Sequence, residues 1–198
     1  MWAKAESDFA GLLTSKVYPL LREIPEYEGL LVTGKPDPAK CRNVAKEVVG
    51  KLQTSGGVHG FGSRQPVAAK EWRDDLFRGA STRNNPFGPW WFDAELVRRW
   101  EGIYLATLSR LERREKIFNS LRPMLAVCYD WNDFTQLWVM KAGGLGIPVL
   151  TGQGTAQPIF SKDAAQTHED NKNVFFIGGY QQVYVPFVPR GRVVQYLI

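Results

Sequence analysis

Cysteine, histidine and long apolar runs are all scarce in this chain of 198 residues. The two cysteines, Cys41 and Cys128, show no CxxC spacing, which excludes a disulfide framework and the usual structural zinc motifs. His59 and His168 have no neighbouring ligand at metal-binding spacing, so we expect no metal. No run approaches the ~18 apolar residues of a membrane span, and the first residues lack the apolar core of a signal peptide. These absences predict a soluble protein of a reducing compartment, the cytoplasm, or a domain that a carrier delivers into a target cell.

The usual signatures of nucleotide and hydrolase sites are also missing. No GxGxxG opens a helix, and no GxSxG elbow is present. The glycine-rich segments 143–146 and 152–154 lack the Lys-Ser/Thr ending of a phosphate loop, and turns explain them better. A Rossmann-type site, a P-loop and a Ser-His-Asp hydrolase are therefore disfavoured.

Apolar and aromatic residues, in contrast, are plentiful, at 44% and 13% of the chain, with seven tryptophans. This composition is typical of a folded protein. The net charge of +5 favours anionic partners such as nucleotides, nucleic acid or acidic proteins. Because glutamates are interleaved with the arginines over 95–115, that segment is typical of a solvated helix face, and nucleic-acid binding is only weakly favoured.

Hydrophobic periodicity predicts helices over 3–23 and 39–52, followed by a glycine-rich break at 56–63. We therefore expect an N-terminal helical portion, 1–65, packed on a main domain, 66–198. In the main domain the pattern predicts one long helix, 93–117. Apolar runs predict strands at 76–80, 123–129, 136–142, 148–152, 174–177, 182–185 and 193–198. Short strands without intervening helices favour antiparallel pairing, so the predicted class is α+β.

Three segments carry candidate chemistry. Arg78 lies near the end of the predicted strand Leu-Phe-Arg-Gly-Ala, and an arginine fork is suited to a pyrophosphate, although a strand end entering a turn is the simpler alternative. Gln181 and Gln182 begin another strand, where a carboxamide can bond sugar hydroxyls or can be merely exposed. Trp90 and Trp91 lie on alternate faces of a strand, so that one of them either lines a cleft or packs in the core.

In this order the segments resemble the ADP-ribosyltransferase superfamily of NAD-consuming toxins and modifiers from bacteria and phages. The run 76–79 is similar to that family's hydrophobic-aromatic-Arg-Gly first strand. Residues 88–92, with a helix from Asp93, stand where the family has its second, Ser/Thr-containing strand and helix. The run 181–186, Gln-Gln-Val-Tyr-Val-Pro, resembles its third motif, in which Gln/Glu-x-Glu precedes an apolar run. The resemblance covers roughly residues 74–198.

The resemblance implies two small antiparallel sheets flanking a cleft, with NAD as the substrate. It implies that Arg78 and Gly79 hold NAD, with the guanidinium on the phosphates and ribose, and that Trp90 or Trp91 flanks the nicotinamide. Gln182 stands where the family usually has its catalytic glutamate, and Gln181 would orient the acceptor or water.

Two departures from the family pattern matter. A neutral Gln182 forfeits the negative charge opposite the developing cation, an electrostatic contribution of about 3–4 kcal/mol. The Ser-Thr-Ser element is missing, since Ser81-Thr82 does not match its position. Glu169 and Asp170 could supply the charge from a preceding loop.

Two main hypotheses therefore remain. One is a toxin or effector that passes ADP-ribose from NAD to water or to a macromolecular acceptor, with a possible immunity or carrier protein as partner. The other is a catalytically inactive basic α+β module that binds protein or nucleic acid; a structural protein of a phage or secretion particle is a third alternative.

Overall fold

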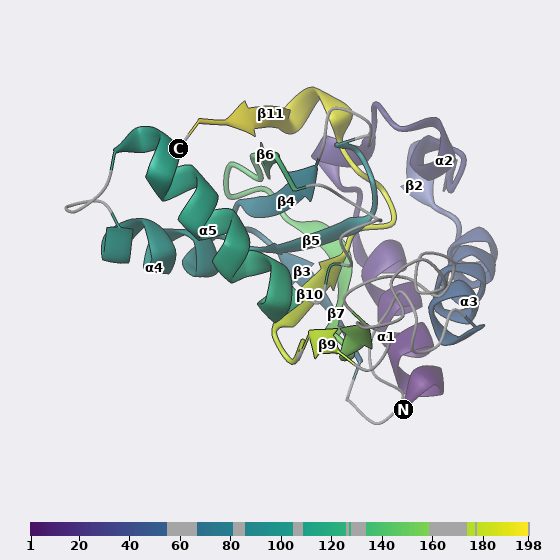
Figure 1. Ribbon diagram of the computed structural model, residues 1–198. Helices are drawn as coiled ribbons and strands as arrows, with labels where there is room; N and C mark the ends of the chain where they lie inside the picture. Colours follow the sequence, from purple (N-terminus) through teal and green to yellow (C-terminus); the bar gives the residue numbers. More distant parts are fainter. Residues whose placement is uncertain are drawn as a thin grey trace.

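The computed structural model describes residues 1–54, 67–80, 86–104, 109–125, 127, 134–158, 174–176 and 178–197 (Figure 1). Within these ranges the helices are α1 (Trp2–Ser15), α2 (Pro25–Glu28), α3 (Pro38–Thr54), α4 (Ala94–Tyr104) and α5 (Arg110–Leu125), with 3-10 turns at Pro19–Leu21 and Arg190–Arg192. The strands are β1 (Leu31–Val32), β2 (Lys35–Pro36), β3 (Ala68–Trp72), β4 (Leu76–Ala80), β5 (Trp90–Asp93), β6 (Gln136–Met140), β7 (Ile147–Gln153), β8 (Gln157–Pro158), β9 (Phe175–Phe176), β10 (Gln181–Tyr184) and β11 (Val193–Tyr196).

Seven of these strands form one sheet in the order β11-β6-β4-β5-β10-β7-β3, in which every neighbouring pair is antiparallel. Two further pairs, β1-β2 and β8-β9, stand apart from it. The predicted α+β class is confirmed. The strands that were expected in two small sheets are instead joined into one by β5. The first half of β5 pairs with β10 and its second half with β4, so this strand connects two halves of the sheet.

Each face of the sheet is covered by helices (Figure 1). On β4, Leu76 belongs to a first core that also contains buried side chains of α1 and α3, whereas Phe77 belongs to a second core under α4 and α5. On β5 the same alternation places Trp91 in the first core and Phe92 in the second. Successive side chains of a strand point to opposite faces, so the two cores lie on opposite faces of the sheet.

The N-terminal helices contribute to the first core together with the sheet. Ala5, Phe9 and Leu13 recur every four residues on α1 and are buried, and α1 packs against α3, β3 and β7. The predicted helix 3–23 divides, because α1 ends at Ser15 and a 3-10 turn starts at Pro19. Proline disfavours the α conformation of the residue before it, which explains the interruption.

The largest correction concerns the segment before β6. The long helix expected over 93–117 is two helices, α4 and α5, and residues 105–108 lie outside the described part of the chain. The strand expected at 123–129 is wrong in its first residues, because α5 continues through Pro123 to Leu125. The buried residues Ile117, Phe118, Leu121 and Leu125 form one helical stripe, and packing of that stripe overrides the strand-like apolar run.

Several expectations fall outside the described residues. These are the glycine-rich break at 56–63, Ser81 and Thr82, most of the expected strand after Leu125, and the acidic pair Glu169 and Asp170. Strands β1, β2, β3 and β8 were not predicted, and the longest of them, β3, pairs with β7 over Ala68–Trp72.

Candidate functional site

The three segments singled out in the sequence lie on three neighbouring strands, β4, β5 and β10. On β4 the last pair with β5 is Phe77 with Phe92, and on β10 the first such pair is Val183 with Trp91. Arg78 is therefore the first residue of β4 that no longer pairs with β5, and Gln182 is the residue of β10 just before its pairing with β5 begins. The fold brings both residues to the junction between the two halves of the sheet.

Arg78 is half-buried, and neighbouring backbone holds its guanidinium. Nη1 donates a hydrogen bond of 2.8 Å to the carbonyl of Trp90. The guanidinium packs directly against Gly88, where any side chain would collide with it. Its Nε is buried without a hydrogen-bond partner among the described residues. Burial lowers the pKa of Arg78 from its ordinary value, which is high enough that the group stays charged at neutral pH.

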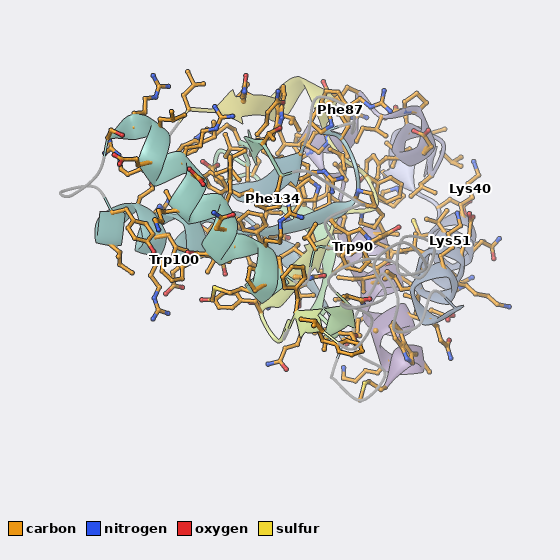
Figure 2. The ribbon with its side chains drawn as sticks, in the orientation of Figure 1. Lys40, Lys51, Phe87, Trp90, Trp100 and Phe134 are labelled. Carbon is orange, nitrogen blue, oxygen red and sulfur yellow. The ribbon has the colours of Figure 1, made fainter. Side chains whose placement is uncertain are left out.

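Gly79 has a packing role that the sequence did not reveal. The ring of Phe134 lies directly on it, and an added Cβ would overlap that ring. Phe134 adopts a left-handed backbone conformation, with a φ of 55°, and packs edge-to-face on Phe118 with 5.5 Å between ring centroids. Figure 2 shows Phe134 beside α5. Glycine is required here because the Phe134 ring lies directly against the β4 backbone on this face.

The two tryptophans of β5 have different surroundings. Trp91 is 1% exposed and belongs to the first core. Trp90 is half-buried, and its ring packs edge-to-face on Tyr184, its partner on β10, with 5.0 Å between centroids (Figure 2). Of the two rings that the sequence nominated, only Trp90 therefore lies near enough to the surface to contact a ligand.

Gln182 is half-buried and is bonded to the end of a helix. Its Nε2 donates a hydrogen bond of 2.7 Å to the carbonyl of Leu125, the last residue of α5. Gln181 is exposed and pairs with Gln153 of β7. A role for Gln181 in orienting an acceptor stays a prediction.

Arg78 and Gln182 belong to opposite faces of the sheet. Arg78 shares its face with Leu76 and with its cross-strand partner Trp138, which packs against the first core. Gln182 alternates with the first-core residue Val183 and bonds α5, which covers the second core. No contact between Arg78 and Gln182 is recorded among the described residues, so their joint action on one ligand stays a prediction.

A pocket of about 710 Å³ lies beside the start of β5 and the end of β10. Its wall includes Phe87, Pro89 and Tyr184, and Arg190 stacks 5.5 Å from the centroid of the Phe87 ring. This pocket could not be predicted from the sequence, because its residues come from three separate segments, 23–26, 87–89 and 184–191, without a shared motif. Among the described residues, no three His, Cys, Asp or Glu side chains gather as metal ligands, and no helix is long and apolar enough to cross a membrane.

No protein-family model matches the sequence, and no curated protein matches it. Among solved structures, one chain with some likeness is titled "Rhs1-CT in complex with cognate immunity protein RhsI1". It is 12% identical to this chain, the alignment covers 74% of this chain and 89% of that chain, and the TM-score is 0.35. A likeness at this identity and score supports no statement about the fold or function of this protein.

Proposed function

We propose that this chain cleaves NAD, releasing nicotinamide and passing ADP-ribose to water. One observation carries the proposal: the three segments that resemble the NAD-site motifs, up to a hundred residues apart in sequence, occupy adjacent strands. Arg78 on β4 and Gln182 on β10 both lie next to the last residue of their strand that pairs with β5.

In this proposal Arg78 binds the diphosphate. Its bond to the Trp90 carbonyl uses one donor and fixes the guanidinium plane, while a guanidinium has five donors in all. The orphaned Nε is a further reason to expect an anionic partner, because a buried donor without a partner costs about 1–3 kcal/mol. Trp90 would offer a ring for the nicotinamide or the adenine.

Gln182 acts on the ribose. Its carboxamide oxygen accepts a hydrogen bond from a ribose hydroxyl as the bond between C1′ and the nicotinamide nitrogen breaks. The electron pair leaves with nicotinamide, a water oxygen attacks C1′, and the water proton passes to solvent. Because Gln182 is neutral and provides no base for a protein nucleophile, while water can attack an oxocarbenium-like C1′ without one, we favour water over a macromolecular acceptor.

The first test measures nicotinamide released from NAD by the purified chain and its variants. Arg78→Ala should abolish turnover, since the diphosphate loses its charged clamp, and Arg78→Lys should recover only part of it because a lysine lacks the planar fork. Arg99→Ala, on the exposed side of α4, is the matched control and should match wild type. Wild-type turnover by Arg78→Ala would refute the assignment.

The second residue is tested in the same assay. Gln182→Ala should lower turnover at least about tenfold, which corresponds to ~1.4 kcal/mol of lost transition-state stabilisation. Gln195→Ala, an exposed glutamine on β11, serves as its control and should leave turnover unchanged. An equal effect of the two substitutions would show that Gln182 has no role in the reaction.

One observation favours the alternative, an inactive binding module. Arg78 and Gln182 are both hydrogen-bonded within the chain and lie on opposite faces of the sheet. If the wild-type chain releases no nicotinamide but binds nucleic acid with an affinity that falls steeply with salt, the module is the better account. An immunity or carrier protein as partner, and delivery as a toxin, stay predictions for this chain.

A further inference from the structure

Gln182 occupies a position that its neighbours fix in one orientation. Leu125 ends α5, and the last carbonyls of a helix have no partner within the helix. The 2.7 Å bond from Gln182 therefore satisfies one of them. Because a carbonyl can only accept, the side-chain atom that faces it must be the NH2 group of the amide.

A second contact holds the same carboxamide. A Cβ added to Gly154 would lie 2.5 Å from Nε2 of Gln182 and 2.9 Å from its Cδ, while the amide oxygen is not among the three nearest atoms. The carboxamide thus packs against the backbone at Gly154, and a Cβ there would force the end of the Gln182 side chain to move. Two independent contacts, with Leu125 and with Gly154, select the same rotamer.

We propose that the carboxyl end of α5 commits position 182 to a neutral amide and so makes its oxygen the group presented to the ligand. A glutamate there would direct a carboxylate oxygen at the Leu125 carbonyl oxygen. The partial negative charge at a helix carboxyl end disfavours a further anion, and partial burial increases that cost. The glutamine is therefore a consequence of how α5 packs on β10, and Leu125 and Gly154 are positioning residues.

The identity of the ligand rests on the proposed function, but the chemistry of recognition does not. An amide oxygen without a neighbouring anion accepts a hydrogen bond from a hydroxyl group, and it adds no negative charge to attract a cation. The site is accordingly suited to a neutral hydrogen-bond donor, which under the proposed function is a ribose hydroxyl. It depends on that hydrogen bond and not on charge stabilisation.

The test compares the thermal unfolding of variants at position 182 and at its exposed neighbour 181. Gln182→Glu should lower Tm by about 4–8 °C and Gln182→Met by about 2–4 °C, because the first adds a repulsion while the second only removes a bond. At the exposed Gln181 both Gln181→Glu and Gln181→Met should leave Tm nearly unchanged. A Gln182→Glu protein as stable as wild type would overturn the inference.

A double-mutant cycle isolates the role of Gly154. Gly154→Ala should lower Tm in the wild-type background, since the added methyl displaces the carboxamide from Leu125, and should lower it less in the Gln182→Ala background. An equal loss in both backgrounds would show that Gly154 does not act through the amide, and would also overturn the inference.

These outcomes are separate from the fate of the proposed function. If wild type releases no nicotinamide, the NAD proposal fails while the order of Tm values still decides the inference. If Gln182→Glu is as stable as wild type and releases nicotinamide faster, the inference fails while NAD cleavage stands.

Discussion

The two faces of the sheet are built in different ways. The first core joins α1 and α3 to the sheet through regularly spaced residues such as Phe9, Leu13 and Val49. The second core contains four phenylalanines under α4 and α5, and the buried Arg122 places its guanidinium 5.7 Å from the Phe134 ring centroid. Both cores contain helical stripes, but the second also depends on close contacts between individual side chains, such as that of Phe134 with Phe118. Because Phe134 and α5 of the second core contact Gly79 and Gln182, we expect substitutions in this core to affect the site, and substitutions on α1 to affect stability alone.

The candidate site draws on both faces. Arg78 stands on the face of the first core and Gln182 on the face of the second, with β5 between their strands. Substitutions in the two cores should therefore separate stability from turnover. A loss in the first core should lower the amount of folded protein, and a change in the second should alter the site itself.

The largest effect is expected in the first core. Leu13 is 0% exposed on α1, so Leu13→Ala should lower the free energy of unfolding by about 2–5 kcal/mol through lost burial and the cavity that remains. Turnover per folded molecule should stay at the wild-type value. Chemical denaturation with a parallel nicotinamide-release assay measures both quantities.

The control for that substitution is a leucine of opposite exposure. Leu111 is 74% exposed on α5, and Leu111→Ala should change stability by less than about 0.5 kcal/mol. If Leu13→Ala reduced turnover per folded molecule as strongly as it reduced stability, the proposed separation between the two faces would be wrong.

The next effect is expected where β4 meets the second core. In Gly79→Ala the new methyl overlaps the Phe134 ring, so the ring must move or β4 must shift, at a cost of about 1–3 kcal/mol. Because Arg78 precedes Gly79, turnover should fall by more than the loss of folded protein explains. Gly102→Ala is the control, since a Cβ there meets nothing within 4 Å on helix α4, and it should leave the site intact and stabilise the chain slightly.

The sequence predicts some elements of the fold closely and fails on others. The helix over 39–52 and the strand at 76–80 were predicted closely, because helical periodicity and a short apolar run are local signals. The end of α5 was not predicted, since the apolar run around Met124 suits a strand as well as a helix. Only the packing of the buried residues of α5 on the sheet decides between the two.

The sequence likewise predicts some features of the candidate site and not others. The sequence nominated Arg78, Trp90 and Gln182 by residue type and order, and the fold places them on neighbouring strands. It could not reveal the contacts of Gly79 with Phe134 or of Gln182 with Leu125, because these join residues more than fifty positions apart with no shared pattern. The burial of Trp91 was also open, since alternation assigns opposite faces without saying which face is covered.

The smallest effect is expected at the amino end of α3, outside both cores. The Asp37 carboxylate accepts hydrogen bonds from the backbone N–H groups of Ala39, at 2.8 Å, and Lys40, at 3.0 Å, and these bonds hold the pKa of Asp37 below its ordinary value. A lowered folded-state pKa means that the stabilisation is present above the ordinary pKa and is lost as pH falls through the folded-state value.

Asp37→Ala should therefore lower Tm slightly at pH 7, and its difference from wild type should shrink below pH of about 4. Asp37→Asn, which caps without titrating, should retain most of the wild-type Tm at pH 7 and show no such loss of its own capping on acidification. Thermal unfolding of the three proteins across that pH range measures this, and a gap between Asp37→Ala and wild type that is constant with pH would show that the carboxylate charge contributes nothing to the cap.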